Sequence, residues 1–325
     1  METDVPYANQ PPRAFWKLCR SEADFRAREF FEPSFDIQPQ DRIATIGSCF
    51  AQNIANYLKA SNATFLDVEP APRKMPSSVA KHYGYGLFSA RYGNVYTARQ
   101  LLQLVKDAIT GQVHEAALWQ KGDRVFDALR PSVEPGGLVT REEVRFHRIS
   151  HLGRVRQMIS DMDVLIFTLG LTETWLDRPT GVVFPTAPGT IAGQYDSARH
   201  VFKNMRYPVI YKDIAETLDL LREISPKLRC ILTVSPVPLT ATATQNHVLG
   251  ATSYSKSVLR AVASDIAEDF EDVDYFPPYE MITGTPFKSA FYEANLRSVT
   301  RAGVDNVMSV FFGAYPQLSK PNFSA

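Results

Sequence analysis

Apolar and polar residues alternate between two kinds of segment from residue 42 onward. Short apolar runs of strand length, typical of a parallel sheet buried on both faces, occupy residues 42–47, 63–68, 163–170, 230–236 and 273–282. Longer segments that the pattern predicts as helices occupy residues 49–59, 97–109, 149–160, 212–224 and 254–270. Strands separated by helices predict an α/β fold, a three-layer α/β/α arrangement around a mostly parallel sheet of about five strands.

Three stretches outside this alternation define the predicted domain organisation. Residues 1–41 contain several prolines and aromatic residues without sustained periodicity, so we expect an N-terminal arm that packs on the domain. Residues 110–147 are predicted to be an insertion with a hairpin around residues 135–137. Because no repeat or clear linker divides the rest, we expect one domain over residues 42–315 and a C-terminal tail at 316–325.

Charge and apolar content exclude several classes of partner. The 35 basic and 35 acidic residues cancel, and no long block of one sign occurs, so nucleic acid and anionic membrane surfaces are not expected partners. The apolar runs are far shorter than the 18 or so residues that a membrane-spanning helix needs. Composition therefore predicts a folded protein without a membrane span, and it leaves the oligomeric state open.

The N-terminus and the cysteines bear on cellular location. Acidic residues and prolines stand where a signal peptide would have a basic start and an apolar core. Cys19, Cys49 and Cys230 are an odd number without Cys-x-x-Cys spacing, which indicates neither a disulfide framework nor a zinc site. We expect a cytoplasmic protein without a metal or other cofactor.

The turn at Gly47-Ser48-Cys49 lies between the first predicted strand and the first predicted helix. Ligands bind outside the carboxyl ends of strands in open parallel sheets. A nucleophile at such a turn is exposed, and the backbone N–H groups of the helix start can stabilise an oxyanion. Cys49 as a small buried residue and Ser48 as a helix N-cap explain the same pattern, so both interpretations stay open.

Six segments of the chain together resemble one known family. They are GSCFA (residues 47–51), YGNVYTARQL, FTLGLTETW, TVSPVPLTAT, YSKSVLRA and DYFPPYE. In this order, over roughly residues 40–310, they resemble the GSCFA family, which is similar to the SGNH or GDSL-type hydrolases. The resemblance implies an SGNH-hydrolase or flavodoxin-like fold, and hydrolysis or transfer of an ester or similar acyl group.

The resemblance also implies roles for the residues around the first turn. The hydrolases carry Gly-Asp-Ser there with Ser as the nucleophile, so Cys49 takes the nucleophile position and Ser48 the position of the Asp. Gly93 matches the glycine whose backbone N–H helps to form the oxyanion hole, and Asn94 lies beside it.

The later blocks of the superfamily are altered in this chain. Thr172 stands in place of an Asn that donates to the oxyanion, and Glu173 in place of an Asp. The superfamily ends on Asp-x-x-His, but that region here contains Asn295 and Arg297, and no histidine follows His247. His247 lies in the long loop after the strand at 230–236 and is therefore the candidate general base, with Glu173 as the other candidate for proton transfer.

Two further groups of residues are candidates for substrate binding. Tyr254, Ser255 and Lys256 begin a predicted helix, where Ser255 or Lys256 would suit an anionic group, although capping and solvation explain them equally. The aromatic residues that would suit either stacking on a sugar ring or ordinary packing are Tyr83, Tyr85, Tyr92, Tyr96 and Trp175.

Two functions follow from these residues. The first is an SGNH-like hydrolase or acyltransferase that acts on a small-molecule or glycan substrate, with Cys49 as the nucleophile. The second is a catalytically degenerate binding module for a glycan or protein partner, which the missing Asp-x-x-His favours. A thiol redox role is less favoured, because Cys230 begins a strand at the opposite end of the predicted sheet from Cys49.

Overall fold

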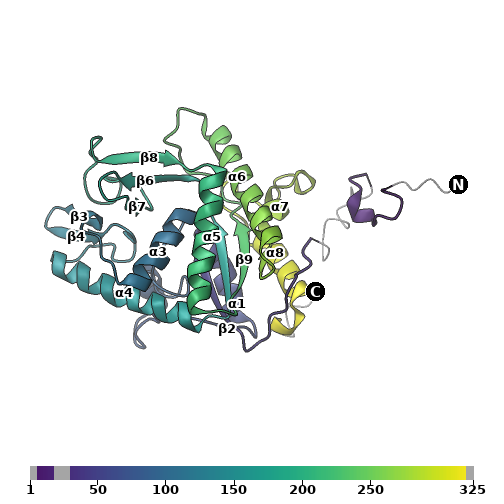
Figure 1. Cartoon of the computed structure of the whole chain (residues 1–325), viewed down its shortest axis with the longest axis horizontal. Coiled ribbons are helices and arrows are strands. Elements are labelled where there is room, and N and C mark those ends of the chain that lie inside the picture. Colours follow the sequence, from purple (N-terminus) through teal and green to yellow (C-terminus); the bar gives the residue numbers. More distant parts are fainter. Residues whose placement is uncertain (1–5, 18–29, 320–325) are drawn as a thin grey trace.

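The centre of the protein is a parallel five-stranded sheet. The computed structural model describes residues 6–17 and 30–319. All neighbouring strands of this sheet run parallel, in the order β10-β9-β5-β1-β2. Their bounds are β1 Arg42–Gly47, β2 Thr64–Phe65, β5 Val164–Leu169, β9 Arg229–Val234 and β10 Val273–Tyr275. With helices on both faces, the sheet confirms the predicted three-layer α/β/α fold (Figure 1).

The helices form the two outer layers. The α-helices are α1 Cys49–Ala60, α2 Ser77–His82, α3 Ala98–Thr110, α4 Arg141–Asp161, α5 Tyr207–Ile224, α6 Val248–Asp269, α7 Pro278–Thr283 and α8 Arg301–Ala314. Short 3-10 helices are η1 Pro12–Ala14, η2 Glu115–Ala117, η3 Thr285–Phe287 and η4 Pro316–Leu318. Alternate side chains of β1 face the two layers. Ala44 and Ile46 pack in the cluster that contains α3 to α6, whereas Ile43 packs with α1 and α8.

Capping residues explain where two of the helices begin. The Thr97 hydroxyl accepts from the Gln100 N–H at 3.2 Å, and the Gln100 side chain accepts from the Thr97 N–H, so α3 begins where the sequence predicts. Thr140 and Glu143 form the same box at α4. This helix therefore begins at Arg141, before the predicted residue 149, and takes in the end of the predicted insertion.

Two small antiparallel sheets differ from the sequence expectation. Strands β6 Glu173–Asp177, β7 Val183–Phe184 and β8 His200–Asn204 form a sheet, in the order β7-β6-β8, that the sequence did not predict. The hairpin of the insertion is β3 Leu118–Lys121 and β4 Arg124–Asp127, so its turn lies near Gly122 and not at residues 135–137. Pro135-Gly136-Gly137 instead lead back to an isolated bridge between Leu138 and Val125.

The hairpin and the small sheet pack on each other. Trp119 of β3 and Phe184 of β7 lie with ring centroids 4.9 Å apart, and both belong to an apolar cluster separate from the main core. Figure 1 shows β6 and β8 above the hairpin β3–β4, on the side of the molecule away from α8. Together they build a wall beside the carboxyl ends of the main strands.

The described end of the arm contacts the layer formed by α1 and α8. Phe31 and Ile37 are buried there, and the Phe31 ring lies 5.1 Å from that of Phe276. The backbone N–H of Ser34 donates to the Asp274 carboxylate at 3.0 Å. Division of the chain into an arm, one domain and a tail stays a prediction. None of the helices in the described parts of the chain is long and apolar enough to cross a membrane.

Candidate functional site

The turn between β1 and α1 requires glycine at its first position. Gly47 has a φ of +150°, and an added Cβ would lie 2.7 Å from the Cβ and carbonyl oxygen of Thr168 on β5. Ser48 takes the N-cap position of α1, and Cys49 is the first helical residue. The Val95 N–H donates to the Gly47 carbonyl at 2.9 Å, which ties the segment before α3 to this turn.

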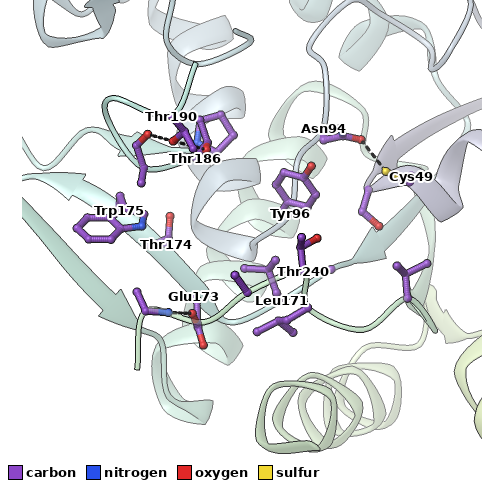
Figure 2. A pocket seen from close by; sticks show the side chains of 18 of the residues that line it. Cys49, Asn94, Tyr96, Leu171, Glu173, Thr174, Trp175, Thr186, Thr190 and Thr240 are labelled. Carbon is purple, nitrogen blue, oxygen red and sulfur yellow. Dashed lines mark hydrogen bonds between the residues drawn. The ribbon is translucent and has the colours of Figure 1, made fainter. Parts of the chain in front are cut away.

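Cys49 exposes its thiol in a cleft. The Cys49 Sγ is placed to donate to the Asn94 side-chain oxygen at 3.9 Å, and the Gln52 amide donates to the same oxygen at 3.5 Å (Figure 2). Ser48 is buried, makes no capping hydrogen bond, and has a hydroxyl oxygen without a partner among the described residues. The thiol is therefore the more accessible of the two adjacent nucleophilic groups.

The cleft has a volume of about 580 Å³ and lies at the carboxyl ends of β1, β5 and β9. Its other walls come from the small sheet, from residues 130–132 of the predicted insertion, and from the segments around 185–191 and 237–243. Arg297, from the loop before α8, completes the lining. The volume is in the range of a site for a small molecule or a short piece of a polymer.

Tyr96 lies in the cleft beside Cys49, and its backbone carbonyl accepts from the Gly170 N–H at 2.9 Å (Figure 2). Burial raises the pKa of the Tyr96 phenol to about 12. A charge on Cys49 contributes to this rise in pKa, whereas Arg297 and a side-chain hydrogen bond with Asn94 oppose it. The phenol is therefore protonated near neutral pH and can donate a hydrogen bond into the cleft.

The predicted oxyanion residues fall into two groups. Asn94 lines the cleft, and Gly93 precedes it in the left-handed region, at φ +67°. Thr172 is fully buried and does not line the cleft. Its N–H donates to the Ser255 hydroxyl at 3.0 Å, and its own hydroxyl donates to the Asn204 side-chain oxygen at 2.6 Å. The structure thus uses both donors of Thr172 beneath the cleft floor.

Glu173 lines the cleft but anchors a wall. One carboxylate oxygen accepts from the Thr242 hydroxyl at 2.6 Å, and the other from the Ala243 N–H at 3.1 Å. Figure 2 shows Glu173 and Trp175 toward the end of the cleft away from Cys49. The carboxylate therefore holds the loop after β9 in place.

The histidines lie elsewhere. His247 is the exposed N-cap of α6, where its Nδ1 accepts from the Leu249 N–H at 3.1 Å. His151 is buried and lies 2.7 Å from the Glu69 carboxylate, and burial lowers its pKa to about 4. All six histidines of the sequence are in the described part of the chain, and none of them lines the cleft. The structure brings no imidazole to Cys49.

Helix α6 begins at Val248 and not at the predicted residue 254, so the candidate substrate-binding residues lie about two turns inside it and divide between surface and interior. Tyr254 is exposed, whereas Ser255 and Lys256 are buried, and none of the three lines the cleft. The Lys256 Nζ donates to the Gly170 carbonyl at 2.5 Å. Burial lowers the pKa of Lys256 to about 7, and the charge of Arg297 lowers it further. Ser255 and Lys256 thus support the turn after β5 from below.

Aromatic residues contribute to one end of the cleft. Trp175 and Phe202, neighbours on β6 and β8, line it with ring centroids 5.6 Å apart. Tyr83, Tyr85 and Tyr92 do not line it. Of the five aromatic candidates, Trp175 and Tyr96 are the two that a ligand in the cleft can touch.

Several lining residues were not singled out by sequence reasoning. Arg130 and Ser132 come from the predicted insertion, and Arg297 comes from the region where the superfamily places its last block. No local pattern marks the first two, because they reach the cleft only through the packing of the hairpin. Among the described residues no cluster of three or more His, Cys, Asp or Glu side chains could hold a metal ion.

Comparison with models of known protein families shows to which family the chain belongs. A model of the GSCFA family matches residues 42–311, which include the Cys49 turn and every wall of the cleft. The chain belongs to the GSCFA family. No curated protein matches this GSCFA-family chain, so its function rests on the site itself.

Proposed function

We propose that this GSCFA-family protein hydrolyses or transfers an ester-linked acyl group, with Cys49 as the nucleophile. The observation that supports this most strongly is the exposed thiol at the first residue of α1, open to a cleft of about 580 Å³. The N–H groups of a helix's first turn have no partners within the helix, so they can stabilise negative charge on a carbonyl oxygen.

The reaction proceeds in two steps. The Cys49 thiol loses its proton to water, its sulfur bonds to the acyl carbon, and the bond from that carbon to the ester oxygen breaks. The leaving oxygen takes one proton from water, which gives an alcohol and a thioester. Water or an acceptor hydroxyl then adds to the thioester carbon and loses a proton, while the sulfur leaves and regains one.

The oxyanion is assigned to donors around the turn. The backbone N–H of Cys49, the side-chain amide of Asn94 and the protonated phenol of Tyr96 are the proposed donors. Gly93 positions Asn94 through its left-handed backbone. Thr172 supports the floor of the cleft, because both of its donors already have partners in the interior.

Proton transfer is assigned without a histidine. Among the described residues, Glu173 is the single carboxylate that lines the cleft, but it lies away from Cys49 and holds residues 242–243, so water is the proposed acceptor of the proton from an incoming hydroxyl. His247 is given no step, because it is exposed and caps α6 outside the cleft lining. A thiol needs less help from a base than a serine hydroxyl does, since it ionises at lower pH.

The proposed substrate is an acylated carbohydrate. Trp175 offers an aromatic ring at the end of the cleft away from Cys49, and the hydroxyls of Thr174, Thr186 and Thr190 line the same part (Figure 2). Sugar rings stack on aromatic faces and present many hydroxyls for hydrogen bonding. A reducing cytoplasm, the location proposed from the cysteines, would keep Cys49 as a free thiol.

The second candidate function is a binding module without turnover. The observation that favours it is the absence of an imidazole from the cleft lining, since all six histidines are described and lie elsewhere. In that case Cys49→Ala would leave the binding of a glycan unchanged. The two candidates therefore separate on whether a thioester forms at Cys49.

The test is esterase activity toward 4-nitrophenyl acetate in three proteins. Wild type is expected to release nitrophenol and to gain one acetyl group on the peptide that contains Cys49, as seen by mass spectrometry of an acid-quenched sample. Cys49→Ala is expected to lose about a thousandfold in kcat/KM or more. Ser48→Ala is the matched control and is expected to stay within about threefold of wild type.

Two results would contradict the proposal. Loss of activity in Ser48→Ala with activity retained in Cys49→Ala would make the serine the nucleophile. Equal, background activity in all three proteins, together with unchanged glycan binding in Cys49→Ala, would establish the binding module.

A further inference from the structure

Arg297 is held at the cleft by a tight turn between α7 and α8. The Asn295 side-chain oxygen accepts from the Arg297 N–H at 3.0 Å, and Leu296 between them has a left-handed φ of 51°. The Tyr292 hydroxyl donates to the Pro236 carbonyl at 2.7 Å, which fixes this loop to the segment after β9. These hydrogen bonds fix the backbone that carries Arg297 at the edge of the cleft.

The Arg297 guanidinium lines the cleft without an anionic partner. Within residues 6–17 and 30–319 its side chain makes no ion pair and no hydrogen bond, and its Nε is buried without a partner. Arg91 and Arg130, which are buried, both pair with carboxylates at 2.8 Å, whereas Arg297 is half-buried and unpaired within those residues. Removing an unpaired cation from water costs free energy, so a ligand that supplies the anion gains by it.

A second basic side chain lies within electrostatic reach of Arg297. Lys256 is 1% exposed, and its one hydrogen bond is to a neutral group, the Gly170 carbonyl. The charge of Arg297 acts on Lys256 and disfavours its protonated form. An anion beside Arg297 would offset this repulsion, so the charge of the buried Lys256 also favours an anion at Arg297.

The remaining polar groups of the cleft do not neutralise Arg297. Glu173 lines the same cleft, but its oxygens accept from the segment 242–243 and it lies toward the end away from Cys49 (Figure 2). Ser48 adds a buried hydroxyl without a partner to the lining next to Cys49. Cys49 and Arg297 both act electrostatically on the phenol of Tyr96, which lies beside Cys49, so Arg297 belongs to this end of the cleft.

We propose that the ester on which Cys49 acts carries an anionic group, and that Arg297 binds this group beside the reacting acyl carbon. That the ligand is an ester rests on the proposed function, whereas the anion site at Arg297 does not. A guanidinium offers two parallel N–H donors, which suit a carboxylate, a phosphate or a sulfate. Arg297 then determines which esters are accepted.

The test compares two alkylating reagents that differ in charge. Iodoacetate and iodoacetamide both transfer a carbon to a thiolate and release iodide, but only the first carries a carboxylate. At constant ionic strength, the ratio of the iodoacetate rate to the iodoacetamide rate is measured at the Cys49 peptide by mass spectrometry. The ratio of the two rates is also measured for glutathione, which serves as the reference thiol without a binding site.

The expected ratio for wild type is about tenfold above that of glutathione, the scale of a charge-assisted hydrogen bond. Arg297→Gln is expected to bring it to the glutathione value, and Arg297→Lys to retain part of the preference. Arg301→Gln is the matched control, because Arg301 follows in the same region with a side chain that is 92% exposed. Sodium sulfate, sodium phosphate and sodium acetate are added separately. The salt that slows the reaction of iodoacetate with Cys49 most shows which anion shape the site prefers.

The results distinguish the failure of this inference from the failure of the proposed function. A wild-type ratio equal to that of glutathione, or one that Arg297→Gln leaves unchanged, overturns the anion site whatever the esterase assay shows. An Arg297-dependent ratio without esterase activity keeps the anion site and removes the hydrolase. If Arg297→Gln does not fold, the wild-type ratio decides: an excess over glutathione that sulfate, phosphate or acetate abolishes supports the site, and its absence overturns it.

Discussion

Cysteine and basic side chains have opposite environments at the two ends of the parallel sheet. At the carboxyl end, Cys49 follows β1 and exposes its thiol, and Lys256 and Arg297 lack a carboxylate partner among the described residues. At the amino end, Cys230 is the second residue of β9 and is 2% exposed. Burial raises the pKa of the Cys230 thiol to about 12. One cysteine is thus open to reagents, and the other is part of the core.

The two ends of the sheet also differ in how their basic residues are paired with carboxylates. Arg42, at the start of β1, pairs with Asp163 at 3.1 Å, and Arg229, at the start of β9, pairs with Asp41 at 2.9 Å. The amino end of the sheet is therefore neutralised pair by pair, as a structural surface is expected to be. The unpaired state of Arg297 at the other end, among the residues that the structure describes, is the observation on which the proposed anion site rests.

The largest predicted difference between the ends is in thiol reactivity. In a Cys19→Ser background, iodoacetamide is expected to modify Cys49 at least about a thousandfold faster than Cys230, because Cys230 reacts only after the core opens. Peptide mass spectrometry over a time course measures both rates. Comparable rates at the two positions would mean that the main core is far less closed than the burial of Cys230 indicates.

A second difference concerns pH and Lys256. Its pKa is about 7 in the folded protein, and an unfolded lysine titrates near 10.4, so the unfolded state binds more protons between these values. The free energy of unfolding is therefore expected to rise by about 2 kcal/mol from pH 7 to pH 9. Urea unfolding at the two pH values measures this rise, and Lys256→Met is expected to lose most of it. An equal rise in the variant would assign the effect to other groups.

Substitution of the two cysteines sharpens the comparison further. Cys230→Ser places a hydroxyl in the main core, which is expected to lower the free energy of unfolding by about 1–2 kcal/mol. Cys49→Ser, at an exposed position, is expected to change it by less than about 0.5 kcal/mol. Chemical denaturation of both variants gives the two values, and the reverse order would place the wrong cysteine in the core.

The smallest effect is expected from a paired charge at the amino end. Arg42 and Asp163 are each more than a third exposed, so Arg42→Gln is expected to cost less than about 1 kcal/mol of unfolding free energy. Thermal unfolding at low and high salt checks this value, since screening should reduce it. A loss of several kcal/mol would show that the pair does more than neutralise the sheet edge.

The sequence was a good guide to the sheet and to the nucleophile turn because both depend on short-range patterns. Unbroken apolar runs mark strands such as β5, and Gly47 between a strand and a helix marks the turn. The small sheet escaped prediction because β7 has two residues and β8 includes Lys203 and Asn204 among its five. Helix α8 also went unpredicted, and the last predicted strand, residues 273–282, is wrong beyond Tyr275 because residues 278–283 form α7. The position of α8 depends on packing against α1 and α7.

The rest of the site depends on where side chains point in the folded protein, which a local sequence pattern does not determine. On α6 the step from Tyr254 to Ser255 passes from surface to interior, so neighbouring candidates have different environments. Arg297 lines the same cleft as Cys49, although 248 positions of sequence separate them, and a turn made by Asn295 holds it there. Such placements follow only from the whole fold.

The separate apolar cluster of Trp119 and Phe184 has a consequence for how the cleft can diversify. The wall that contains Trp175 rests largely on its own small core, with Leu176 also packed on the main core, while the Cys49 turn rests on the main sheet. Insertions, deletions or exchanged loops in the wall can therefore be accommodated without moving Gly47, where no other residue fits. Recombining this wall between relatives offers protein engineers a way to change what the cleft accepts while leaving the thiol where it is.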